Sequence, residues 1–227
     1  MCGRYTYYST SEIVEEFGLI PKEIPQLELF KDNYNVTPGS DMPVMIRGKQ
    51  EHILEQMIWG LIPVWSKSES TGLKLINARK EGLFEKSMWK RLVKDHRSVV
   101  PARGFYEWKK LDDRSKQPFY ITPSKGTVFA FAGLWDDWKS PSGQRIRTYT
   151  IITTAPNKEM SEVHNRMPAI LTKEQSDIWL SPLELTQSQV DDILTPSPDG
   201  SVVLTKVSKD VNNPRNNRED LIYPLED

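Results

Sequence analysis

The sequence predicts a single α+β domain with an antiparallel, barrel-like β core and short flanking helices. Two observations point to this class: β-prone apolar runs bounded by turn residues dominate the chain, and the helical patterns between them are short. The 227 residues, 37% of them hydrophobic, suffice for one core. The 16 prolines and 12 glycines are scattered rather than gathered into a linker, so we expect one domain over residues 1–227.

The first predicted elements are a strand over residues 2–8 and a short helix after it. Ser9 and Glu12 have the spacing of a capping box, in which both side chains bond the backbone at a helix start. An apolar helical face follows and stops at Gly18, a residue that commonly ends helices.

The middle of the chain predicts a β-hairpin. Apolar runs at residues 43–46 and 52–61 flank Arg47-Gly48-Lys49, which suits a turn. Further β segments are expected at residues 98–108, 119–122 with 127–135, and 145–153. Helical patterns occupy residues 82–94, 157–163, 173–180 and 188–194.

Charge and hydropathy exclude several classes of protein. Thirty Lys and Arg residues against 31 Asp and Glu residues leave a formal net charge of −1, so any anion-binding surface must be local. The longest nearly unbroken apolar stretch, residues 57–65, is far shorter than the roughly 18 residues that cross a bilayer. Because no secretory signal opens the sequence either, we expect a cytoplasmic, intracellular protein that does not enter a membrane.

The sequence offers few metal ligands. It has one cysteine, and its three histidines lack the short paired spacings of zinc motifs. We therefore expect no structural metal and no cofactor.

The single cysteine, Cys2, stands directly after Met1. Removal of Met1 would give Cys2 a free α-amine beside its thiol. An aldehyde suits this pair, because the amine forms a Schiff base and the thiol then closes on the same carbon to give a five-membered thiazolidine. The alternative is that Cys2 is an ordinary residue next to the start of translation.

Three further side chains are candidates for chemistry. Asn77 and Arg79 are two residues apart, so an extended chain would place them on one face, where a carboxamide and a guanidinium could bind a carbonyl beside a phosphate. Glu107 lies in an aromatic β segment, where partial desolvation would raise its pKa toward the range that suits a general acid. The alternatives are a turn with a solvated arginine and an edge-strand glutamate that points to water.

His164 lies between a short helical pattern and an apolar run, at a corner where functional side chains often occur. A histidine can shuttle a proton near neutral pH, although a lone histidine is also common in purely structural roles.

Seven tryptophans are more than a core of this size requires. Exposed aromatic rings beside arginine hold single-stranded nucleic acid by base stacking. We expect Trp65 and Trp108 to be exposed and the remaining tryptophans to pack in or around the core.

Six blocks of sequence occur together in this chain. They are Met-Cys-Gly-Arg-Tyr at 1–5, Asn-Val-Thr-Pro at 35–38, Trp-Gly-Leu-Ile-Pro-Val-Trp at 59–65, Asn-Ala-Arg at 77–79, Gly-Phe-Tyr-Glu-Trp at 104–108 and His-Asn-Arg-Met-Pro at 164–168. In this order they resemble the SOS-response-associated peptidase (SRAP) family over nearly the whole chain.

The resemblance implies a function in the DNA damage response. Members of the family shield abasic sites in single-stranded DNA by a thiazolidine between the processed N-terminal cysteine and the ring-opened sugar. By motif match, the resemblance implies catalytic roles for Cys2, Asn77, Glu107 and His164. Asn77 would hold the Cys2 amine and the sugar, and Glu107 and His164 would move protons. The implied DNA contacts are Arg4, Arg79, Trp65, Trp108 and Pro38.

We also expect a monomer that acts on abasic single-stranded DNA and that meets the replication machinery. A Schiff base permits β-elimination, so lyase activity is expected as a side path. Met1 would leave either by the action of an aminopeptidase or by self-cleavage, an autopeptidase activity. The chain departs from the family where Gly82 follows Glu81, so Lys80 and Lys86 are further candidates for the phosphate contact.

Two other classes of function remain open. A cysteine peptidase or N-terminal-nucleophile hydrolase would use Cys2, His164 and Glu107 on peptide bonds, in the narrowest case only to release Met1. A non-covalent single-strand binder would need only the tryptophans and arginines.

Overall fold

The computed structural model describes residues 2–18, 30–49, 51–112 and 115–225. In chain order the strands are β1 (Arg4–Tyr7), β2 (Asn33–Val36), β3 (Asp41–Arg47), β4 (His52–Trp59), β5 (Asn77–Arg79), β6 (Arg97–Ala102), β7 (Gly104–Lys110), β8 (Lys116–Pro123), β9 (Phe129–Lys139), β10 (Arg145–Thr154), β11 (Met167–Pro168), β12 (Ile170–Leu171) and β13 (Val202–Lys206). The α-helices are α1 (Thr10–Glu16), α2 (Ser87–Asp95), α3 (Lys158–Ser161), α4 (Lys173–Leu180) and α5 (Gln187–Ile193). The predicted α+β class is confirmed.

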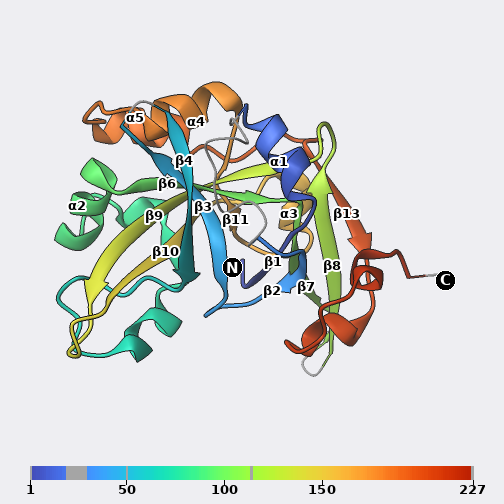
Figure 1. Cartoon of the computed structure of the whole chain (residues 1–227). Coiled ribbons are helices and arrows are strands. Elements are labelled where there is room, and N and C mark those ends of the chain that lie inside the picture. Colours follow the sequence, from blue (N-terminus) through green and yellow to red (C-terminus); the bar gives the residue numbers. More distant parts are fainter. Residues whose placement is uncertain (1, 19–29, 50, 113–114, 226–227) are drawn as a thin grey trace.

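Five strands close into a barrel (Figure 1). The ring runs β10–β4–β3–β6–β9 and returns to β10, because β9 pairs with β10 over seven residue pairs, from Arg145 opposite Lys139 to Ile151 opposite Gly133. All these pairings are antiparallel except β10 with β4. Closure removes the exposed sheet edges that favour aggregation.

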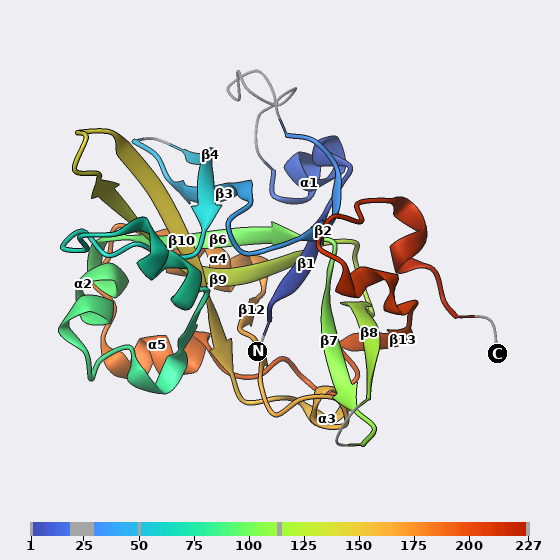
Figure 2. The ribbon, with the colours of Figure 1, turned by 90° about the horizontal axis from the view of Figure 1, so that it is seen from below.

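A second sheet, in the order β13-β8-β7-β1-β2, stands beside the barrel (Figures 1 and 2). Its strand β1 lies in the middle of the molecule in both views, whereas the C-terminal segment lies at the outer side of this sheet. Tyr5 and Tyr7 of β1 belong to the main core together with Cys2. The start of the chain is therefore part of the core rather than a surface arm.

Helices α2 and α4 pack against the outside of the barrel, on β6 and β9 (Figure 1). Helix α2 buries Trp89, Leu92 and Val93, and α4 buries Trp179 and Leu180. Among the described residues, no helix is long and apolar enough to cross a membrane.

Most predicted elements are present. The hairpin forms as β3 and β4, and Gly48 N–H donates to the Glu51 carbonyl in its turn (2.8 Å). Helix α4 has the predicted bounds, while the predicted segment 98–108 is two strands, β6 and β7, with a break at Arg103. Strand β13 was not predicted.

The predicted capping box is wrong. Ser9 has a left-handed backbone (φ 57°), and its side chain makes no capping hydrogen bond. The Glu12 carboxylate instead accepts from Arg103 (2.8 Å). The Ser9 N–H donates to Asp32 (3.0 Å), so a tertiary contact replaces the local motif at this position.

Candidate active site

Cys2 lies just before β1 and is fully buried. Its thiol donates a weak hydrogen bond to the Arg4 carbonyl (3.8 Å). Burial raises the pKa of this thiol above its ordinary value, and the negative charge of Glu107 raises it further. The sulfur therefore favours the neutral thiol until a base removes its proton.

Asn77 joins β5 to the start of the chain. Strand β5 runs parallel to β10, with Asn77 opposite Ile151, and this pairing brings Asn77 to Cys2. The Asn77 side-chain N–H₂ donates to the Cys2 carbonyl (2.8 Å). The predicted partner was the Cys2 amine, whereas the observed partner is the carbonyl of the same residue, so Asn77 holds the Cys2 backbone in place.

Glu107 faces the main core from β7. Sequence alternation left its orientation open, and the structure resolves it. Phe105, on the same face of the strand as Glu107, belongs to the main core, whereas Tyr106 and Trp108 belong to a second apolar cluster on the other face. Glu107 is only 3% exposed, and it lies near enough to Cys2 for its charge to act on the thiol.

His164 is half-buried in the loop between α3 and β11. Its Nδ1 lies 3.0 Å from the Arg166 backbone N and 3.3 Å from the Arg166 carbonyl O. When the neutral ring accepts from the Arg166 N–H, the ring proton is on Nε2. The ring then carries its proton on the nitrogen that makes neither of these two contacts.

Arg166 ties the His164 loop to the Asn77 segment. Its guanidinium forms a bidentate ion pair with Glu81 (2.8 and 3.0 Å) and donates to the Thr153 carbonyl (2.5 Å). This pair lowers the pKa of Glu81 below its ordinary value. Sequence reasoning missed Arg166 even though it follows His164 by two residues, as Arg79 follows Asn77.

Arg79 is exposed beside a pocket of about 460 Å³ that Asn77, Lys86 and Arg166 also line. Lys86 is exposed, so both cations are free of burial. Lys80 differs, because its ammonium donates to the Asp191 carbonyl (2.8 Å) on α5. Of the two lysines considered for a phosphate contact, only Lys86 lines this pocket.

The two tryptophans differ in exposure. Trp65 is 68% exposed, as predicted. Trp108 is only half-buried rather than open, because its indole N–H donates to Asn212 (2.7 Å) in the C-terminal segment. Segments that follow β13 were not predicted, so this contact had no signal in the sequence.

The remaining predicted DNA contacts have internal roles as well. Arg4 donates to the Asn35 side chain and to the Val211 carbonyl (both 2.9 Å), which fastens the C-terminal segment to β1 and β2. Pro38 is half-buried in the turn between β2 and β3, next to Gly39, whose φ of 89° suits glycine. Their contacts to DNA stay predictions.

Behind Cys2 the core contains a hydroxyl pair that sequence reasoning missed. The Tyr5 and Tyr149 hydroxyl groups lie 2.6 Å apart, and both residues are fully buried. Burial raises the pKa of both phenols, and the nearby Cys2 contributes to each shift. A tyrosine inside an apolar strand gives no sequence signal that its hydroxyl meets another.

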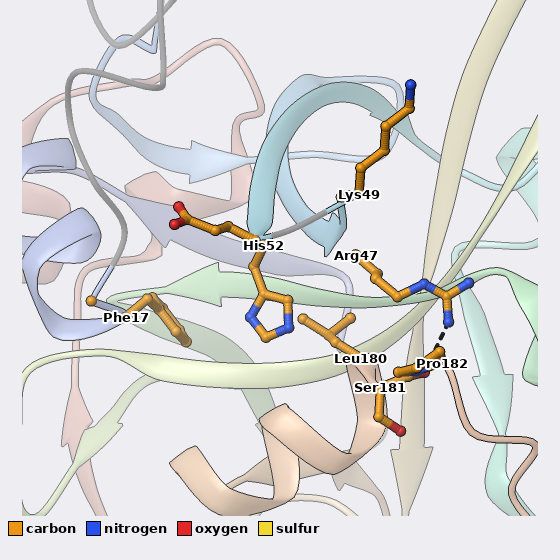
Figure 3. A pocket seen from close by; sticks show the side chains of 10 residues that line it. Phe17, Arg47, Lys49, His52, Leu180, Ser181 and Pro182 are labelled. Carbon is orange, nitrogen blue, oxygen red and sulfur yellow. Dashed lines mark hydrogen bonds between the residues drawn. The ribbon is translucent and has the colours of Figure 1, made fainter.

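A larger pocket, of about 670 Å³, lies away from these residues (Figure 3). It is formed by the β3–β4 hairpin and the end of α4, and Arg47 donates to the Ser181 carbonyl there (3.1 Å). Since none of the predicted site residues lines it, the size of a cavity does not identify the site in this protein.

Together the fold and these contacts describe an α+β protein with a thiol-centred candidate site at the start of the chain. The family model described as SOS response associated peptidase (SRAP) matches residues 1–214. The chain belongs to this family, as its sequence blocks predicted.

Relatives and a solved structure agree with this membership. The chain is 40% identical to abasic site processing protein YoqW of Bacillus subtilis (strain 168), over 98% of this chain and 99% of that protein. It is 31% identical to abasic site processing protein HMCES of Gallus gallus, over 87% of this chain and 67% of that protein. A crystal structure of a Bacteroides thetaiotaomicron protein superposes with a TM-score of 0.85, covering 99% of this chain and 100% of that one at 24% identity, and so shares the fold.

Proposed function

We propose that this protein processes abasic sites in single-stranded DNA by forming a covalent thiazolidine through Cys2 after Met1 is removed. The observation that carries the proposal is the buried Cys2, held by Asn77 and within the electrostatic reach of Glu107. The names of the relatives, abasic site processing proteins, support the substrate class. Action on DNA damage is the function that this family membership supports.

The chemistry begins with the sugar. An abasic deoxyribose is mostly a cyclic hemiacetal, so its aldehyde appears only after the ring opens. His164 donates a proton to the ring oxygen in this step, and the same residue takes it back when the ring recloses. A half-buried loop position leaves part of the His164 ring accessible to a substrate.

Two bonds then form at the aldehyde carbon. The Cys2 amine attacks it and the carbonyl oxygen leaves as water, which gives the imine. The Cys2 sulfur adds to the imine carbon, and the thiol proton passes to the nitrogen, which closes the five-membered ring. Glu107 relays protons in both steps, and its burial keeps bulk water from competing for them.

Asn77 and the exposed groups serve binding. Asn77 fixes the Cys2 backbone so that amine and thiol meet one carbon. Arg79 holds a phosphate, with Lys86 beside it. Trp65, Trp108 and Pro38 support neighbouring bases, so single strands react before duplexes.

The imine and the Cys2 nucleophile each allow one side reaction. The imine permits β-elimination at the 3′ phosphate, a lyase reaction that ring closure by the thiol suppresses. Self-removal of Met1 would use the same nucleophile on a peptide bond. The peptidase alternative predicts an acyl-enzyme instead of a DNA adduct, and the non-covalent alternative predicts that Cys2→Ala leaves every DNA complex intact.

Denaturing gels of the protein mixed with abasic single-stranded DNA test the proposal. Wild type should form an adduct that survives denaturation without reductant. Cys2→Ser keeps the amine but lacks the thiol, so its adduct should appear only after borohydride reduction. Reductant-independent adducts of equal yield in Cys2→Ser would rule out the thiazolidine.

A further inference from the structure

Trp65 sits in a tight turn at the end of a segment that the barrel holds closely. The Gly60 N–H donates to the Tyr149 carbonyl (2.8 Å), and the Leu61 N–H donates to the Leu75 carbonyl (3.1 Å). The Ser66 N–H then donates to the Pro63 carbonyl (2.8 Å), which closes a turn with Trp65 at its corner. A large indole at such a corner, 68% exposed, gains little from packing.

Three buried side chains form hydrogen bonds to the backbone of alternate residues, Ile62, Val64 and Ser66, in the segment that contains Trp65. The Thr148 hydroxyl accepts from the Ile62 N–H (2.9 Å), and the Asp136 carboxylate accepts from the Val64 N–H (3.1 Å). The Trp138 indole N–H donates to the Ser66 carbonyl (2.7 Å). These bonds lie on both sides of Trp65.

The three side chains form one rigid row. Asp136 and Trp138 are two residues apart on β9, and Thr148 on β10 is directly opposite Asp136, so all three point to the same face of the barrel wall. Each is at most 1% exposed.

Asp136 is itself fixed. Its carboxylate accepts from Arg91 (2.5 Å) and from the Asp137 N–H (3.0 Å), and His96 Nδ1 lies 3.7 Å away. A buried carboxylate with this many donors has a defined orientation. The Asp136 carboxylate that binds the Val64 N–H is therefore held in place independently of the turn.

We propose that Thr148, Asp136 and Trp138 are positioning residues that fix the backbone of the turn carrying Trp65, so that its exposed indole is presented for stacking on a base of single-stranded DNA. The inference rests on the proposed function, in which Trp65 contacts a base. A turn whose backbone is already held in place loses less conformational freedom when Trp65 binds a base, so the three anchors increase affinity without touching DNA.

A double-mutant cycle tests this coupling. Reversible binding is measured by fluorescence anisotropy with a labelled single-stranded oligonucleotide that lacks an abasic site, so that no covalent step contributes. Trp65→Ala should weaken binding by about 5- to 100-fold. Trp138→Phe and Thr148→Val, which each remove one anchor, should weaken it about threefold in the wild-type background and not at all in the Trp65→Ala background.

Trp179→Phe is the matched control. Trp179 is equally buried, and its indole N–H donates to the Ser98 carbonyl (3.0 Å), a bond of the same kind that does not involve the Trp65 turn. This variant should change affinity by the same factor in both backgrounds. Anchor variants that behave like Trp179→Phe would overturn the inference.

The two proposals fail in different ways. If Trp65→Ala binds as tightly as wild type while abasic DNA still forms adducts, the positioning inference is wrong and the proposed chemistry stands. If the cycle shows coupling but no adduct forms, the anchors position Trp65 as inferred and the proposed covalent function is wrong.

Discussion

The candidate site has a buried interior around the Cys2 thiol and a set of exposed groups that are proposed to bind DNA, called the rim below. The two parts are built on opposite principles. Cys2 and Glu107 are almost completely buried, and Asn77 donates one hydrogen bond to the Cys2 carbonyl. On the rim, Arg79, Lys86 and Trp65 face solvent. In the interior each group depends on its neighbours, so a single change should have a large effect, whereas rim groups act in parallel through weaker, screened contacts.

Burial also gives the interior its chemistry. Removing ionisable groups from water costs free energy, which the surrounding core must offset. In return, a carboxylate and a thiol influence each other strongly in a medium of low dielectric constant. The exposed cations of the rim, Arg79 and Lys86, gain none of this strengthening, and their side chains stay free to follow a flexible strand of DNA.

The largest effect on the interior is expected for Asn77→Ala. Loss of the bond to the Cys2 carbonyl frees the backbone that carries both nucleophiles, and the rate constant of adduct formation should fall by about 100-fold. Single-turnover crosslinking on abasic single-stranded DNA measures it.

Asn35→Ala provides the control. The Asn35 amide donates to the Val211, Asn213 and Asn216 carbonyls, so its loss should lower the melting temperature. It should leave the crosslinking rate of the folded protein near that of wild type. Equal rate losses in the two variants would show that Asn77 acts only through stability.

The rate of ring closure should depend on pH through the ionisation of the Cys2 thiol. Because burial, followed by Glu107, raises the pKa of the Cys2 thiol, little thiolate exists at neutral pH, and ring closure should continue to accelerate as the pH increases beyond about 8.5, the ordinary pKa of a thiol. Glu107→Gln removes the repelling charge and lowers that pKa, so its closure profile should move to lower pH.

The same variant loses its proton relay, so its maximal closure rate should fall by about 10-fold or more. Closure is measured as the fraction of crosslinks that no longer require borohydride. Glu12→Gln, at a surface ion pair with Arg103, should leave the profile unchanged. A Glu107→Gln profile that coincides with wild type would remove Glu107 from the site.

The sequence predicted much of this candidate site, but it predicted some residues better than others. Cys2 drew attention by its place in the chain, and the two-residue spacing of Asn77 and Arg79 predicted their common face. The orientation of Glu107 could not be predicted, because Phe-Tyr-Glu-Trp has apolar contacts on both faces of β7. Alternation identifies a buried face only where the opposite face meets water.

Long-range pairing was the second limit. The hairpin and α4 follow from local patterns, but closure of the barrel depends on the pairing of β4 with β10, whose paired residues are ninety positions apart in the sequence (Thr148 opposite Ile58). The contact of Trp108 with Asn212 and the bond of Arg4 to Val211 depend equally on where the C-terminal segment folds back. Residue types alone do not show which distant segments of the chain come into contact.

The smallest effects belong to the rim. Arg79→Ala should weaken reversible binding of single-stranded DNA several-fold and reduce the slope of log affinity against log salt by about 0.7. Lys80→Ala is the matched control, because Lys80 is bound to Asp191 and should leave the slope unaltered. If both variants change the slope equally, the distinction between these two cations is wrong.

The central claim is a covalent bond between Cys2 and the lesion, and intact mass spectrometry tests it most directly. The protein is mixed with a single-stranded oligonucleotide whose one uracil has been removed by uracil glycosylase, and no reductant is added. The expected species is the chain without Met1 plus the oligonucleotide minus one water, present in wild type and absent in Cys2→Ala. A wild-type spectrum with only the free chain, or the same adduct in Cys2→Ala, would contradict the claim.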